Sequence, residues 1–338
     1  AVLAVLTTLY VPNQKIPKGG KFDWFSFLAV GMGCVCMLMV LIYGETDGWT
    51  APGVLAWMYG GFCSFALAFI SCMTHRTPLL DVRVLGNWRF LCGLLASLCN
   101  IFCICWVRVG TVQFMRNVMN YEPVGIAYVF MVLVAGFCGG AALVLPLMQK
   151  GRLALRVGMM AGLLALGASA FFLSRLDAGC SWLDVAWPLG LFGIGYAFCL
   201  NTATPLALRG VEGRSAAASS RTLNTVRYIF ISLYVSSVST VLAHMKTGFR
   251  FSMAEQVRDD SPGTAHTLDM WQRHFAETGG TAREIHASVD AVLQKAVALQ
   301  SQVFSVDTFY LCTVIVGAAG VLFALFCLKS GQERKAAS

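Results

Sequence analysis

The sequence predicts an all-α polytopic membrane protein with about eight transmembrane helices, and composition, apolar stretches and loop charges each support this. Hydrophobic residues make up 57% of the 338 residues and charged residues only 12%, about half of the roughly 25% that is usual in soluble domains. Several stretches contain about 20 mostly apolar residues, which is the length that a helix needs to cross a bilayer. The strands of a membrane barrel are about half as long and alternate in polarity, so a barrel does not fit.

The predicted spans follow one another along most of the chain. They are residues 24–43, 53–73, 88–109, 124–147, 153–174, 185–206, 222–243 and 306–328. Asn100 and Arg108 interrupt the third of these stretches. Residues 1–11 are apolar and resemble the end of an earlier span, so we expect the chain to be the C-terminal part of a longer protein whose N-terminal half is missing.

The loops between these spans alternate in charge. One set holds fourteen basic residues, namely Lys15, Lys18, Lys21, Arg76, Arg83, Lys150, Arg152, Arg156, Arg209, Arg214, Arg221, Lys329, Arg334 and Lys335. The opposite set holds three, namely Arg108, Arg116 and Arg175. Cytoplasmic loops carry the excess of Lys and Arg, so the C-terminus is predicted to be cytoplasmic and the protein to lie in a bacterial inner (plasma) membrane. These loops also explain the net charge of +8 without a nucleic-acid partner.

Residues 244–304 are predicted to form a long polar loop on the other side of the membrane. This loop holds four of the five histidines: His244, His266, His274 and His286. Either a metal or partner site or a plain connector would suit it, and the connector is favoured because the spacings match no compact ligand set. Apolar residues at helical spacing in 281–302 predict an amphipathic helix leading into the last span. No cofactor is predicted.

Polar side chains within apolar helices are costly and often functional. Those within or just beyond the predicted spans are Asn100, Gln113, Asn201, Thr202, Asn224 and Arg227. Asn224 and Arg227 are three residues apart and so share one helix face. The six are candidates for a substrate pathway, although Asn, Ser and Thr also join helices by hydrogen bonds in any bundle. No Asp or Glu lies in the middle of a span, so a coupling carboxylate is expected outside this chain.

Several short motifs resemble the fourteen-helix drug:proton antiporter branch of the major facilitator superfamily. They are Phe22-Asp23-Trp24, Asp47-Gly48-Trp49, Pro78-Leu79-Leu80-Asp81-Val82-Arg83, Gln113 followed by Tyr121-Glu122-Pro123-Val124-Gly125, Gly151-Arg152 with Arg156-Val157-Gly158, and Ser219 with Asn224 and Arg227. The resemblance covers nearly the whole chain.

This resemblance implies a domain organisation. Residues 1–11 would end a preceding helix, residues 12–87 would hold an inserted helix pair with its linkers, and residues 88–338 would form the C-terminal six-helix bundle with its loop 244–304. The first, second, fourth and fifth helices of such a bundle line the central cavity. Those spans contain the polar candidates named above, while the apolar spans 153–174 and 306–328 would be peripheral.

The resemblance also implies a function: proton-coupled efflux of small, drug-like molecules by alternating access. Aromatic residues would contact the substrate or pack in the core: Trp106, Phe114, Tyr128, Phe130 and Tyr196. The partners would be the lipid bilayer, the substrate, a proton, the missing N-terminal half and, at the long loop, a periplasmic adaptor. Two alternatives stay open: a non-transporting scaffold or pseudogene product, and a membrane-bound transferase, for which His75 lacks an acidic neighbour in sequence.

Overall fold

The computed structural model describes residues 23–74, 82–149, 152–177, 179–208, 215–258, 270–271, 273–274 and 282–329. Within these residues the regular structure is helical. The helices are α2 (Trp24–Thr46), α3 (Pro52–Thr74), α4 (Val82–Leu85), α5 (Trp88–Asn117), α6 (Pro123–Gln149), α7 (Arg152–Leu173), α8 (Trp182–Leu208), α9 (Ser215–Arg258) and α11 (Ala282–Lys329). Eight of them are long and apolar enough to cross a membrane, which confirms the predicted fold class. The interpretation of residues 1–11 lies outside the described residues.

Three helices run further than the hydropathy predicts. α5 continues past Arg108 to Asn117, α9 has 44 residues and α11 has 48. At 1.5 Å per residue α9 is about 66 Å long, roughly twice the thickness of a hydrocarbon core. The prediction of a loop is therefore wrong for 244–258, which continue α9, whereas the helix expected at 281–302 is confirmed as the first part of α11.

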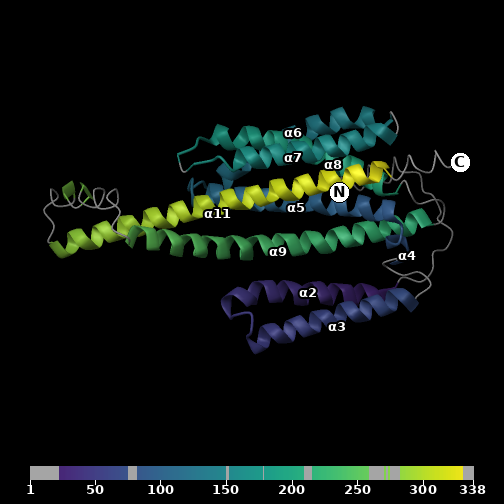
Figure 1. Cartoon of the computed structure of the whole chain (residues 1–338), viewed down its shortest axis with the longest axis horizontal. Coiled ribbons are helices and arrows are strands. Elements are labelled where there is room, and N and C mark those ends of the chain that lie inside the picture. The colour runs from purple at the N-terminus through teal and green to yellow at the C-terminus, as the bar shows by residue number, and fades with distance from the viewer. Residues whose placement is uncertain are drawn as a thin grey trace.

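Helices α5 to α9 and α11 form one bundle, and the α2–α3 hairpin lies beside α9 (Figure 1). The ends of α9 and α11 project together beyond the other helices (Figure 1). The rings of Phe249 on α9 and Phe304 on α11 lie 6.2 Å apart. A hydrogen bond joins the hairpin to the bundle: the Thr240 hydroxyl donates to the Leu41 carbonyl at 3.1 Å.

Asp23 caps the start of the α2–α3 hairpin, and Gly48 forms the turn between its two helices. The Asp23 carboxylate caps α2 by accepting from the Ser26 backbone N–H at 3.0 Å and from the Ser26 hydroxyl at 2.5 Å. Such a cap satisfies donors that the first helical turn leaves free. Gly48, with a φ of +93°, supplies the left-handed conformation of the turn between α2 and α3, which side chains other than glycine rarely adopt.

α8 lies between α6 and α7, and glycines bring the three helices into backbone contact. A Cβ at Gly193 would meet the carbonyl of Leu133 in α6, and one at Gly136 would meet the carbonyl of Gly190 in α8. On the α7 side, a Cβ at Gly195 would lie 2.8 Å from the carbonyl of Gly162. Small residues are what allow such close approach between membrane helices.

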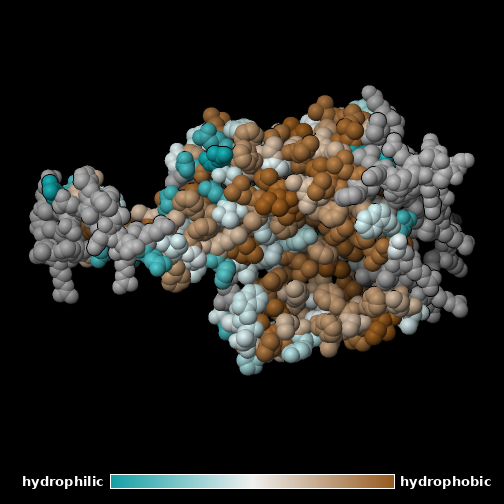
Figure 2. All heavy atoms as spheres, in the orientation of Figure 1, coloured by the Kyte–Doolittle hydropathy of each residue, from teal (hydrophilic) through white to brown (hydrophobic). Residues whose placement is uncertain are grey.

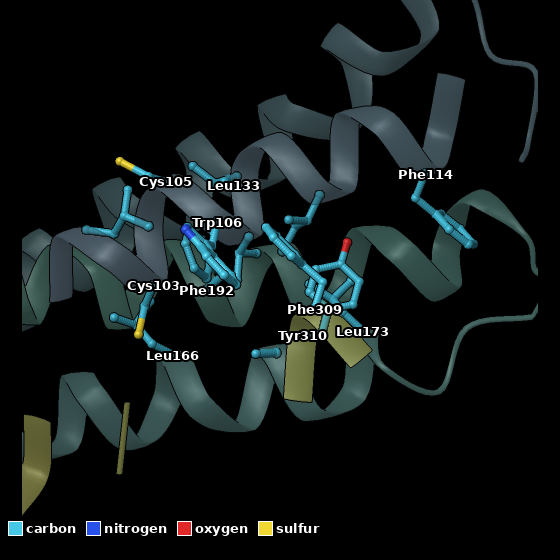
Figure 3. Packing of buried hydrophobic residues seen from close by; sticks show 14 of the residues in the cluster. Cys103, Cys105, Trp106, Phe114, Leu133, Leu166, Leu173, Phe192, Phe309 and Tyr310 are labelled. Atoms are coloured by element: carbon cyan, nitrogen blue, oxygen red, sulfur yellow. The ribbon is translucent and has the colours of Figure 1, made fainter. Parts of the chain in front are cut away.

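The core of the bundle surrounds α5. The rings of Trp106 on α5 and Phe309 on α11 stack with centroids 4.0 Å apart and planes 2° apart, and both rings lie within the packed cluster shown in Figure 3. Beside them the hydroxyls of Thr111 and Tyr310 form a buried hydrogen bond of 2.8 Å. An aromatic stack and this buried hydrogen bond thus help to anchor α5 to α11.

The outer surface of the bundle suits contact with lipid. Figure 2 shows hydrophobic residues over most of the visible surface of the helices, and hydrophilic residues gathered toward the end where α9 and α11 project. Phe62, Met131 and Ile315 are each more than half exposed. Large apolar patches of this kind would be unusual on a soluble monomer, so the chain is a multi-pass integral membrane protein.

Candidate functional site

A cavity of about 340 Å³ lies between α5, α8 and α9. It is lined by Ser97, Asn100, Ile101, Ile104, Cys105 and Arg108 of α5, by Tyr196, Leu200 and Ala203 of α8, and by Asn224, Arg227, Tyr228 and Ile231 of α9. Its size falls within the range of small-molecule sites. Each wall carries an exposed side chain: Arg108 on α5, Leu200 on α8 and Tyr228 on α9.

Arg227 connects the three walls of this cavity. Its Nε donates to the Ser97 hydroxyl of α5 at 2.6 Å, and its Nη1 donates to the Thr204 hydroxyl of α8 at 2.7 Å. The side chain is half-buried. Both acceptors are neutral, so these bonds fix the position of the guanidinium without neutralising its charge.

Asn100 lies one helical turn beyond Ser97 on the same wall. Its side chain is only 2% exposed, and its Oδ1 has no hydrogen-bond partner in the described part of the chain. Leaving a buried polar atom unpaired costs about 1–3 kcal/mol. The wall of the cavity therefore holds a buried acceptor that has no hydrogen bond within the described part of the chain.

The cavity is elongated along α5. Arg108 lies eleven residues beyond Ser97 in the sequence, which corresponds to about 16 Å along a helix. Between these two ends the lining is mostly aliphatic and aromatic, with Ile104, Tyr196 and Leu200 as examples. Two arginines and no carboxylate are among the residues that line it.

The structure brings three of the six sequence-predicted candidates together. Asn100, Asn224 and Arg227 all line the cavity, and the last two do so from one face of α9, as their spacing predicts.

The other three candidates lie outside this lining. Gln113 accepts a 3.5 Å hydrogen bond from Asn117 near the end of α5. Asn201 donates to the carbonyl of Ala197 in its own helix at 2.8 Å. Thr202 is buried against α7, where its hydroxyl lies 3.5 Å from the Met159 sulfur.

The aromatic candidates also separate. Tyr196 lines the cavity, whereas Trp106 and Phe114 are buried in the core (Figure 3). Tyr128 is 71% exposed on the outside of α6, and Phe130 packs against the edge of the core. These placements favour the packing or lipid-contact interpretation for those four.

Sequence reasoning missed Ser97, Arg108 and Thr204. A helical spacing could have revealed the first two, because residues 97, 100, 101, 104, 105 and 108 recur at intervals of three and four and so form one face of α5. Thr204 carries no such sign. Its role depends on a contact with Arg227, which is 23 residues away in the sequence.

Two further features bear on chemistry. Among the described residues, no group of three or more His, Cys, Asp or Glu side chains could hold a metal ion; His244 and His274 lie within that part of the chain, and His266 lies outside it. Asp307 of α11 is half-buried, and its Oδ1 has no described hydrogen-bond partner.

The chain is similar to known transport proteins. It is 26% identical over 246 residues to the multidrug resistance protein Stp of Mycobacterium tuberculosis, covering 72% of this chain and 45% of the relative. It is 21% identical over 276 residues to a probable actinorhodin transporter of Streptomyces coelicolor, covering 77% of this chain and 45% of that protein. The chain thus spans about half the length of these curated relatives. No protein-family model matches it.

One solved structure shows the same architecture. A bacterial homologue of the human lysosomal transporter Spinster, in an inward-facing and unoccupied conformation, superposes with a TM-score of 0.50 at 15% identity. The match covers 89% of this chain and 69% of that protein. The helices of this chain are therefore arranged as in that protein.

Proposed function

We propose that this chain acts in a secondary active transporter that exports small, drug-like molecules, and that the cavity between α5, α8 and α9 binds the substrate. One observation carries the proposal: Asn100, Asn224 and two arginines, Arg108 and Arg227, line a single cavity inside an otherwise apolar bundle. Charged groups at membrane depth are rare, and they mark substrate and ion pathways. The similarity to a multidrug resistance protein supports the same class of substrate.

The proposed mechanism is alternating access coupled to protons. In this mechanism a second helical bundle faces the cavity, and rocking of the two bundles exposes the site to each side of the membrane in turn. Arg227 suits such a site, because its two hydrogen bonds to Ser97 and Thr204 hold α5, α8 and α9 together as one wall. The proton-carrying carboxylate would lie outside the α5–α11 bundle.

The finer assignment follows the resemblance in short motifs. α2 and α3 would be the inserted pair of the fourteen-helix branch, and the bundle from α5 to α11 would be its C-terminal half. The protein would lie in the inner membrane of a bacterium with its C-terminus in the cytoplasm, as the distribution of Lys and Arg predicts. The hairpin's separate position beside α9 (Figure 1) supports the first of these assignments.

Filling the cavity with a bulky side chain tests the proposal. Leu200 lines the cavity on α8 and is 43% exposed, whereas Leu183 on the same helix is 56% exposed and does not line it. Leu200→Trp and Leu183→Trp are therefore a matched pair. Inverted membrane vesicles from cells expressing each variant would be energised, and uptake of anionic, neutral and cationic aromatic dyes would be followed by fluorescence, with and without an uncoupler.

We expect wild-type vesicles and Leu183→Trp vesicles to take up at least one dye, and the uncoupler to abolish that uptake. Leu200→Trp, at equal expression, should reduce the initial rate about tenfold, because a 1 Å error in a binding site already costs large factors in rate. Uptake equal to that of vesicles lacking the protein, for every dye, would contradict transport. Equal uptake by the two variants would remove the cavity from the proposal.

A further inference from the structure

The charge of the cavity is unbalanced. Arg227 and Arg108 line it, and no Asp or Glu is among the described residues that do so. An uncompensated charge in a medium of low dielectric is costly unless it is paired. Because the hydroxyls of Ser97 and Thr204 are the acceptors that hold Arg227, its positive charge remains available for a partner that carries negative charge.

We propose that the cavity binds an organic anion: an elongated, mainly aromatic or aliphatic molecule with an acidic group that pairs with Arg227. This inference rests on the proposed function, since it names the substrate class of the same site. A guanidinium has five N–H donors in a planar fork, and two hydrogen bonds to hydroxyls leave three for a ligand. A carboxylate matches that fork in geometry as well as in charge.

Asn100 adds a second requirement. The residue lines the same cavity, and its Oδ1 is buried and has no described partner. Asn100 is three residues from Ser97, so the acceptor lies about 4.5 Å along the helix from the level at which Arg227 is held. A ligand that places a hydroxyl or an amide N–H at this distance from its acidic group would satisfy both sites at once.

The remaining lining defines the body of the ligand. Ile101, Ile104 and Ile231 provide aliphatic surface, while Tyr196 and Tyr228 provide aromatic surface. This part favours fused or linked rings by burial of apolar area. Arg108 is exposed at the far end, about 16 Å away along α5, where a second acidic group could be accommodated with part of its hydration intact.

Two dyes of the same shape and opposite charge test the inference. Fluorescein carries a carboxylate and phenolic oxygens, whereas rhodamine 6G has the same xanthene frame, an esterified carboxyl group and a positive charge. The purified full chain in lipid nanodiscs would be titrated with each dye at pH 7.5, and binding would be measured by fluorescence anisotropy after subtraction of empty nanodiscs. The variants are Arg227→Gln and Arg227→Lys, with Arg221→Gln as the control at an exposed site on the same helix.

We expect the wild-type chain to bind fluorescein at least tenfold more tightly than rhodamine 6G. Arg227→Gln should weaken fluorescein binding about tenfold, since charge-assisted pairs are the strong ones and each factor of ten is about 1.4 kcal/mol. Arg227→Lys should lose less than half as much binding free energy for fluorescein as Arg227→Gln loses. Arg221→Gln should bind fluorescein as tightly as the wild-type chain. If Arg227→Gln does not fold, Arg108→Gln is the second test variant and Arg116→Gln is its control, because both arginines are exposed. We expect Arg108→Gln to weaken fluorescein binding about threefold.

The inference is overturned if rhodamine 6G binds as tightly as fluorescein, or if neither Arg227→Gln nor Arg108→Gln weakens fluorescein binding. If rhodamine 6G binds as tightly as fluorescein and Leu200→Trp abolishes its binding, the preference for anions is overturned, but the cavity remains the proposed transport site. No binding of either dye above the nanodisc background, together with no dye uptake in energised vesicles, would overturn both.

Discussion

Two faces of α8 are closed by backbone contacts, Gly193 against α6 and Gly195 against α7, whereas Tyr196 and Leu200 line a cavity of about 340 Å³. Where α8 packs on α7, polar groups are paired: for example, the Ser169 hydroxyl of α7 donates to the Pro188 carbonyl at 2.7 Å. On the cavity side, the buried Oδ1 of Asn100 has no described partner.

This difference shows how one helix can serve both stability and binding. Where glycines bring backbones together, no space remains for a ligand, and packing supplies the association energy that the hydrophobic effect does not supply between helices in lipid. Where longer side chains hold α5, α8 and α9 apart, space and unpaired polar groups remain. We therefore expect substitutions on the packed side to change stability and substitutions on the cavity side to change binding and transport.

The largest expected effect on stability is at the α6–α8 contact. Gly136→Leu places a side chain against the backbone of Gly190, so the two helices must separate, and the unfolding free energy should fall by about 3 kcal/mol or more. Thermal unfolding of the detergent-solubilised protein, followed by size-exclusion chromatography, measures this. Gly139→Leu is the control, because an added Cβ there meets nothing within 4 Å. Equal losses in the two variants would contradict the assigned packing.

A smaller effect is expected in the core between α5 and α11. Thr111→Val removes the hydrogen bond to the Tyr310 hydroxyl and should lower the unfolding free energy by about 1 kcal/mol, within the range of interhelical bonds in membranes. Thr313→Val is the matched control, because the Thr313 hydroxyl bonds only to the Phe309 carbonyl in its own helix. Unfolding in a detergent series would rank the two variants, and a larger loss in Thr313→Val would count against this account of the pair.

The number and positions of the membrane helices could be predicted because a helix needs about 20 mostly apolar residues to cross a bilayer, and stretches of that length are easily recognised in the sequence. The ends of α9 and α11 could not, since polarity marks where a helix leaves the lipid and does not mark where the helix ends. Phe249 and Phe304 pack together beyond that point, and this contact joins segments that are far apart in sequence.

The cavity was predictable only in part. The spacing of Asn224 and Arg227 indicated a shared face, and both do line the cavity. Polarity alone could not separate Asn100, which faces the cavity, from Thr202, which faces α7, because that depends on which neighbour each side of a helix meets. The bond from Arg227 to Ser97 spans 130 residues of sequence, and no local pattern predicts it.

The measurement that tests the central claim most directly is paired dye uptake and thermal unfolding of Asn100→Leu. Leucine has the same branching and the same number of side-chain heavy atoms, and it removes the unpaired Oδ1, so the unfolding free energy should stay the same or rise by about 1 kcal/mol. Dye uptake by energised vesicles should fall about tenfold, because the ligand loses its hydrogen bond within the cavity. Wild-type uptake by a folded Asn100→Leu protein would contradict the account, and it would show that this cavity is not where the substrate binds.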